Sequence, residues 1–177
     1  FTGAVAFPIP RTGAEVVWNT RTTPPNYTMG GIYSDIAVFS NGARSERRST
    51  IVSEYPYANP ENKLGDEEAE LGIWAAHVLT KVHKPVRDKG KITSIFEPYD
   101  YITHAREAWQ YVPGSRRVRR APTVGYDTPD GPGGFVTVDD TLGFNGAMDR
   151  FTWTLVGKSE LYVPFHNYKF DEAGLSH

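Results

Sequence analysis

Apolar and polar residues alternate along much of this chain with a period of two, and this pattern constrains its fold more than any other feature. Residues 151–155, Phe-Thr-Trp-Thr-Leu, show it most clearly. Because successive side chains of a strand point to opposite faces, the pattern favours half-buried antiparallel strands. Turn-forming residues bound further segments of this kind, and the strand candidates are residues 32–39, 44–55, 73–82, 91–96, 101–112, 116–120 and 160–168.

Helical patterns are few and short. Residues 13–20 could form about two turns, and residues 59–70 combine a proline near the start with acidic first turns, which suits the helix dipole. The density of proline and glycine in residues 127–134 predicts a long ordered loop or a flap. The chain is therefore expected to be mainly β, with a curved antiparallel sheet and few short helices.

Composition places the chain among ordinary globular proteins. Hydrophobic residues make up 39% and aromatic residues 13%, the net charge is −2, and cysteine is absent. Residues 1–177 are expected to form a single domain. The lack of cysteine excludes disulfides, thiolate metal sites and cysteine nucleophiles within this sequence. No apolar run is long enough to cross a bilayer.

A hairpin-like unit over residues 109–122 carries two aromatic residues, a Pro-Gly turn and four arginines. After the turn, guanidinium groups alternate onto both faces of the returning strand, which favours an edge strand. A second group of arginines lies on the candidate strand 44–55. If the two strands were adjacent, they would form a basic patch able to contact an anionic group or a partner. Its members are Arg44, Arg47, Arg48, Arg116, Arg117, Arg119 and Arg120.

Four segments together resemble a bacterial envelope family whose members are commonly labelled outer-membrane lipoprotein-sorting proteins. The match is looser between residues 41 and 100. The segments are Phe7-Pro-Ile-Pro10 with Trp18-Asn19, residues 108–122 with Tyr126-Asp127, Phe144-Asn-Gly-Ala147 through Trp153, and residues 155–164. Family members are longer at both ends, so we expect these residues to be the central portion of a longer envelope protein.

The resemblance implies a fold related to LolA and LolB, an unclosed β half-barrel whose concave face shelters acyl chains. Aromatic residues at strand positions would then line the cavity, and we expect Trp109 and Trp153 in particular to lie in the core or the cavity wall. The full set of cavity candidates is Trp74, Phe96, Trp109, Tyr111, Phe151 and Trp153. The resemblance also implies a periplasmic location or association with the outer membrane, with an RND-type exporter and an outer-membrane barrel protein as partners.

Catalytic and metal-binding patterns are missing from the sequence. It has no nucleophile elbow, phosphate loop or H-E-x-x-H motif, and His77 and His83 are too far apart on one strand to chelate one ion directly. Asp127, Asp130, Asp139 and Asp140 surround a glycine-rich loop without calcium-loop spacing. Capping or pairing with arginine suits these acids better, so we expect no cofactor and no metal.

These patterns favour a non-enzymatic envelope protein that binds or shuttles a lipid or another hydrophobic molecule. Two alternatives stay open. One is an interaction module that docks a partner strand or helix at the sheet and has no small ligand. The other is an enzyme for hydrophobic substrates that uses Asp139, Asp140 or His104 as acid or base. Nucleic acid is not an expected partner, because the net charge is slightly negative and no binding motif is present.

Overall fold

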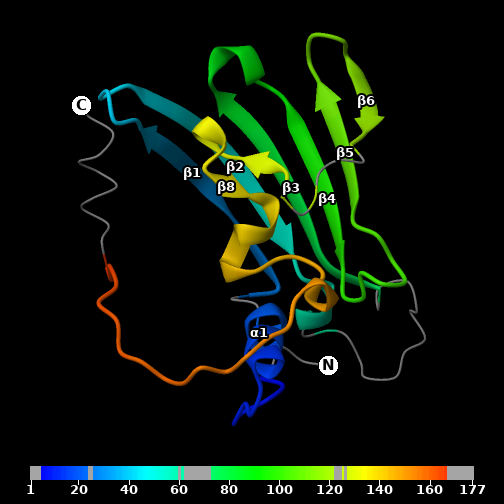
Figure 1. Ribbon diagram of the computed structural model, residues 1–177. Helices are drawn as coiled ribbons and strands as arrows, with labels where there is room; N and C mark the ends of the chain where they lie inside the picture. The colour runs from blue at the N-terminus through cyan, green and yellow to red at the C-terminus, as the bar shows by residue number, and fades with distance from the viewer. Residues whose placement is uncertain are drawn as a thin grey trace.

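A six-stranded antiparallel sheet forms the centre of the molecule (Figure 1). The computed structural model describes residues 5–23, 26–59, 61, 73–121, 125 and 127–166, with the side chain of residue 142 left aside. The strand order is the chain order, β1-β2-β3-β4-β5-β6, and each neighbouring pair is antiparallel. The expectation of a mainly β protein with an open antiparallel sheet is confirmed.

The strands lie close to the segments whose alternation predicts them. Their bounds are β1 Thr28–Val38, β2 Arg44–Glu54, β3 Trp74–Lys84, β4 Ile92–Pro98, β5 Glu107–Val112 and β6 Arg117–Arg120. Because each strand reverses direction, the turns after β1, β3 and β5 all lie at one end of the sheet, and we call it the hairpin end. The only α-helix among the described residues, α1, lies at the opposite end (Figure 1).

Helix α1, Gly13–Thr22, forms where the sequence predicts a short helix. Its start is a capping box: the Thr12 hydroxyl accepts from the Glu15 amide at 3.2 Å, and the Glu15 carboxylate accepts from the Thr12 amide at 3.2 Å. Residues 153 and 154 cross over the first turn so closely that a Cβ on Gly13 would lie 2.7 Å from the Trp153 carbonyl carbon. Glycine at this position allows the later chain to pack on the helix.

Several strand predictions are wrong in extent. Residues 101–104 form a turn rather than the start of a strand, because the Asp100 carboxylate accepts from the amide of Ile102 at 2.8 Å and from the hydroxyl of Thr103 at 2.6 Å. Residues 151–155 and 160–166 have no strand assignment, since their backbone finds no ladder partner among the described residues. Residues 167–168 and nearly all of the helix predicted at 59–70 lie outside the described residues, and Pro56–Ala58 before it is a 3-10 turn, η1.

One face of the sheet is covered by the segment 128–150, which lies in front of β2 and β3 in Figure 1. This segment contains the short strands β7 (Pro129–Asp130) and β8 (Val136–Thr137) and the 3-10 turns η3 (Pro132–Gly134), η4 (Val138–Gly143) and η5 (Met148–Arg150). Arg47 joins it to the sheet by ion pairs to Asp35 at 2.8 Å and Asp130 at 2.6 Å, and Phe39 packs on Phe135. We call this side the covered face.

The fully buried side chains on the covered face are small. Ala37, Ser49, Ser53, Ala76 and Ala108 are buried there, and alanine is the only residue type among the buried hydrophobic residues of the described chain. Small side chains let an irregular segment lie close against a sheet, but they bury little apolar area each. Larger apolar side chains on the same face are half-buried; they are Tyr33, Ile51, Val78, Val82 and Ile95.

Candidate functional site

The opposite face of the sheet carries large apolar side chains that are exposed. Val52, Leu79 and Trp109 lie in one row across it, because Val52 is paired with Leu79, Leu79 with Ser94, and Ser94 with Trp109. Leu79 is 43% exposed and Val38 is 63% exposed. We call this side the open face and define it by Ile32, Ile36, Val38, Val52, Leu79, Trp109 and Val118. Polar residues lie between some of these side chains, since Ile36 is paired with Glu46 and Val38 with Arg44. Large apolar side chains exposed together on one face of a sheet are typical of a binding surface.

Four of the six aromatic cavity candidates belong to this face. The Trp74 ring lies 5.7 Å from the Phe96 ring, and the Phe96 ring lies 4.7 Å from the imidazole of His77. The pairing register of β3 and β4 shifts between residues 74 and 76, which interrupts the alternation of faces along β3. The Trp74 ring therefore packs beside Phe96 and does not share the face of Ala76. Trp109 and Tyr111 continue the aromatic surface on β5. Trp109 is 41% exposed, so it lines the open face rather than the core.

The other two candidates, Phe151 and Trp153, belong to a separate aromatic cluster with Phe144. The ring centroids of Phe144 and Trp153 are 4.8 Å apart, and those of Phe151 and Trp153 are 5.7 Å apart. The Trp153 indole N–H donates to the Met148 carbonyl at 2.9 Å. Residue 153 of this cluster lies against the first turn of α1, and neither ring lines the open face, although Phe151 is 50% exposed.

The arginine candidates do not form one patch across adjacent strands, and that prediction is wrong. Three strands separate β2 from β6 in the sheet order. Arg47 points to the covered face and is held by Asp35 and Asp130, whereas Arg48 and Arg120 project on the open face, with Arg120 paired to Glu107 at 3.4 Å. The remaining arginines of the set, Arg44, Arg116, Arg117 and Arg119, are exposed.

A buried polar cluster beneath the covered face was not predicted. Glu97 at the end of β4 accepts from the Arg106 guanidinium at 2.6 Å and from the Tyr101 hydroxyl at 2.7 Å. The side chains of Arg106 and Glu97 are only 6% and 7% exposed. Arg106 also donates to the Asn145 carbonyl at 2.6 Å, and the Asn145 amide donates to Glu97 at 3.1 Å. We call this group, with Arg21, Asp139 and Arg150, the polar clamp.

The polar clamp joins three parts of the chain that are far apart in sequence. Arg21 at the end of α1 donates to the Gly146 carbonyl at 2.6 Å and lies over the Tyr101 ring at 5.1 Å. Asp139 accepts from Arg150 at 2.8 Å and is 3.7 Å from Arg106. The family-like segment beginning at Phe144 therefore supplies backbone and side-chain partners for buried charges. No pattern in the sequence signals this role, because Arg106 and Glu97 lie outside the resembling segments.

Electrostatics support a structural role for the clamp. Burial raises the pKa of Tyr101 to about 12, and the neighbouring Glu97 charge adds to this effect. Burial opposes the charged form of Arg106, but Glu97 and Tyr101 outweigh it and raise the pKa of Arg106. The buried groups are paired with one another, and this arrangement holds parts of a fold together.

The aspartates of the glycine-rich loop are engaged as caps and ion pairs. Asp140 accepts from the Thr137 amide at 2.6 Å, which lowers the pKa of Asp140, while Asp127 and Asp139 pair with Arg150. Burial acts to raise the pKa of Asp130, but hydrogen bonds from Arg47 and from the Gly131 amide hold it below its usual value. Among the described residues, no group of three or more histidines and acids is placed to hold a metal ion.

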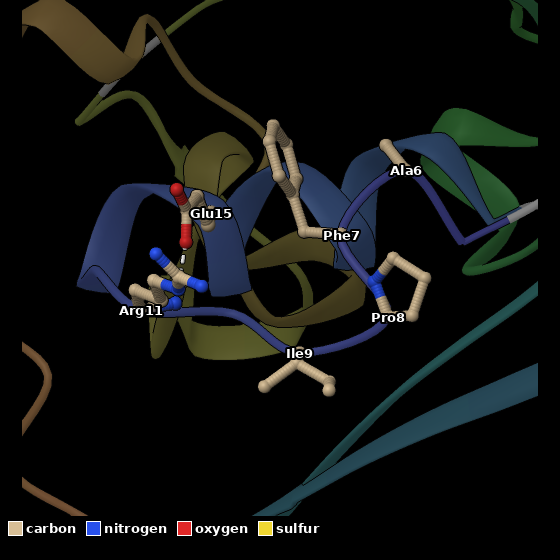
Figure 2. Close-up of a pocket in the computed structure, with 6 residues that line it drawn as sticks. All are labelled: Ala6, Phe7, Pro8, Ile9, Arg11 and Glu15. Atoms are coloured by element: carbon tan, nitrogen blue, oxygen red, sulfur yellow. Dashed lines mark hydrogen bonds between the residues drawn. The ribbon is translucent and has the colours of Figure 1, made fainter.

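A shallow pocket lies where the N-terminal segment meets α1 (Figure 2). Figure 2 shows the Phe7 and Ile9 side chains directed to different sides of the strand-like segment, and the Arg11 amide donating to Glu15. Asn19 holds this segment, because it accepts from the Phe7 amide at 2.8 Å and donates to the Phe7 carbonyl at 2.7 Å. The pocket is lined by Ala6, Phe7, Pro8, Ile9, Arg11 and Glu15, and the Glu15 carboxylate in it belongs to the capping box of α1.

None of the helices in the described part of the chain is long and apolar enough to span a membrane.

The chain is 33% identical over 195 residues to an uncharacterised protein of Pseudomonas aeruginosa, PA3922, with 100% of this chain and 38% of the relative covered. The chain thus spans about two fifths of that relative. A crystal structure of a DUF1329 family protein from Desulfovibrio piger matches with a TM-score of 0.44 and 14% identity, over 66% of this chain and 41% of that one. A family model described as "Protein of unknown function (DUF1329)" matches residues 1–177, so the chain belongs to this family.

Proposed function

We propose that the open face of the sheet binds a lipid or another hydrophobic molecule, and that this protein carries or passes that molecule in the bacterial envelope. One observation carries the proposal: the sheet buries alanine and serine on its covered face and exposes isoleucine, valine, leucine and tryptophan on its open face. A protein that needed this sheet only as a scaffold gains stability by burying the larger side chains. Exposure of those side chains therefore indicates an apolar partner.

The position of the aromatic residues supports a flat or extended apolar ligand. Trp109 and Tyr111 on β5 and the Trp74–Phe96 pair on β3 and β4 border the aliphatic row of Val52 and Leu79. Rings of this kind offer large contact area with little loss of side-chain entropy. The periplasmic location, the RND-type exporter and the outer-membrane barrel partner belong to the proposal as well, and they rest on the resemblance described above.

The proposal can be tested with a fluorescent fatty acid. The wild-type protein is expected to bind the probe saturably, and Leu79→Glu is expected to weaken binding by about tenfold or more, because a carboxylate in the middle of the open face opposes apolar contact. Val156→Glu is the matched control, since Val156 is 98% exposed and lies outside the sheet. Equal binding by both variants would contradict the proposal. A probe recovered in chemically changed form would instead favour the enzyme alternative.

A second candidate function is an interaction module, and the segment that follows the aromatic cluster supports it. Leu161, Tyr162, Val163 and Phe165 are exposed in an irregular segment, and the outer edges of β1 and β6 have no strand partner among the described residues. In strand addition, an extended apolar segment of one chain pairs with a free sheet edge of another. A folded sample that shows no saturable probe binding but captures a stoichiometric polypeptide by native mass spectrometry would favour this candidate.

A further inference from the structure

We propose that the β3–β4 and β5–β6 hairpins dock this protein onto an anionic phospholipid surface through their tips. We define the hairpin tips as residues 85–91 and 113–117, at the hairpin end of the sheet. They contain Arg87, Lys89, Lys91, Arg116 and Arg117 but only one acid, Asp88. Five basic residues minus one acidic residue give the tips a net charge of +4, in a chain whose total charge is −2.

The two tips form one surface because they pack against each other. A Cβ placed on Gly90 would lie 3.2 Å from Cγ of Pro113, so the β3–β4 turn approaches the β5–β6 turn closely at this point. Each turn is also held by its own backbone: Lys89 donates to the Val86 carbonyl at 3.2 Å, and Arg116 donates to the Pro113 carbonyl at 3.2 Å. The positive charges are therefore displayed on ordered neighbouring turns, which Figure 1 shows at the top of the sheet.

An aliphatic side chain projects between these charges. Val86 is 87% exposed at the start of the 3-10 turn η2, Val86–Asp88, and the next side chain, Arg87, is 84% exposed. An apolar residue flanked by cations suits the boundary between lipid head groups and acyl chains, where the cations meet phosphates and the apolar group enters the interface. An acidic protein partner would use the cations but has no need of the exposed valine.

Charge is distributed unevenly between the two ends of the sheet. The exposed or half-buried acids Glu54, Asp100 and Glu107 lie at the end where α1 is found, away from the tips. A positive tip surface orients the molecule towards an anionic membrane. In this orientation the strands of the open face run towards the lipid surface, which would let the apolar ligand proposed above enter from it. The docking surface itself does not depend on that ligand.

Sedimentation with vesicles tests the docking surface. We expect the wild-type protein to bind vesicles of 30% phosphatidylglycerol in phosphatidylcholine, to bind pure phosphatidylcholine at least tenfold more weakly, and to lose affinity as salt is raised. Arg87→Gln, Lys89→Gln, Arg116→Asn and Arg117→Gln combined should lower the partition coefficient by about 100-fold, since each basic residue near the surface contributes severalfold. Asparagine suits position 116, where φ is 52°.

Matched variants complete the test. Val86→Ser is expected to weaken vesicle binding about 3- to 10-fold, whereas Arg11→Gln with Lys158→Gln, two exposed cations outside the tips, should change it less than twofold.

Wild-type binding to neutral vesicles as strong as to anionic ones, or full binding by the quadruple variant, would overturn the proposal. Polyglutamate binding that Val86→Ser leaves intact, without vesicle binding, would assign the tips to an acidic protein instead. Fatty-acid binding by the quadruple variant should be unchanged, which separates this test from that of the open face.

Discussion

At the scale of single residues, the polar clamp is the feature on which the covered face depends. The Arg106 side chain is almost fully buried, and it donates hydrogen bonds to the Glu97 carboxylate and the Asn145 carbonyl. It also lies within ion-pair distance of Asp139. Removal of such a group leaves buried acceptors without a donor, and the energetic effect is then much larger than the net strength of the ion pair.

Arg106→Met is therefore expected to lower the free energy of unfolding by about 3–5 kcal/mol. Arg120→Met is the matched control, because Arg120 is exposed and its pair with Glu107 is expected to contribute no more than about 1 kcal/mol. Urea denaturation followed by circular dichroism measures both values. Similar stability losses in the two variants would show that the clamp is not a structural centre.

The tryptophans on the two sides of the sheet should behave differently. Trp153→Ala is expected to cost about 3 kcal/mol, because it removes a ring from the aromatic cluster and a hydrogen bond to the Met148 carbonyl. Trp109→Ala should cost about 1 kcal/mol, since its ring is partly exposed on the open face. Iodide quenching checks the difference, and Trp109→Phe should remove much of the quenchable emission while Trp153→Phe should not.

At the scale of elements, the covering segment is attached to the sheet by ion pairs as well as by packing. Asp130 in β7 is bound by Arg47 of β2, and Asp35 of β1 shares the same guanidinium. Since the folded pKa of Asp130 is lowered, its pairing contributes stability above the unfolded pKa of about 4, and this contribution is lost as the pH falls through the lower folded pKa.

Asp130→Asn should destabilise the protein by about 1 kcal/mol at pH 7, a value reduced by the partial exposure of the pair. The difference from wild type should shrink as the pH falls below about 4, because the carboxyl group is protonated first in the unfolded state and only at lower pH in the folded state. Asp127→Asn is the control, and it should change stability by less than about 0.5 kcal/mol, because Asp127 is highly exposed. A difference that is constant from pH 7 to pH 3 would argue against the ion pair.

At the scale of the whole molecule, the two faces of the sheet differ in what covers them. The covered face is closed by the chain's own segment 128–150, and the open face exposes Ile32, Leu79 and Trp109 among other apolar side chains. A ligand that binds the folded state alone stabilises it by mass action, by about 2.7 kcal/mol at a free concentration 100 times its Kd.

A saturating fatty acid is thus expected to raise the unfolding temperature of the wild-type protein by about 5–10 °C, given its length. Leu79→Glu should abolish the shift at the same ligand concentration, and Val156→Glu should retain it. Scanning calorimetry with and without ligand makes this comparison. A shift that is equal in all three proteins would place binding outside the open face.

The sequence alone determined the strands and their order along the chain, because period-two alternation and turn residues are local signals. It also determined helix α1, whose Thr12 and Glu15 form a local capping box. The alternation within 151–155 misled the prediction, since an extended chain that packs Phe151 and Trp153 on one cluster has the same pattern as a strand but lacks a ladder partner among the described residues.

Tertiary structure decided which face of the sheet is covered and which arginines lie close together. Alternation divides the side chains of a strand into two sets but does not say which set the remaining chain covers, and here it covers the set that includes Ala37, Ser49 and Ala76. The separation of β2 from β6 depends on pairing across the whole sheet, and the polar clamp joins residues from 21 to 150. Such long-range contacts follow from packing and buried charge, for which no local pattern in the sequence provides a signal.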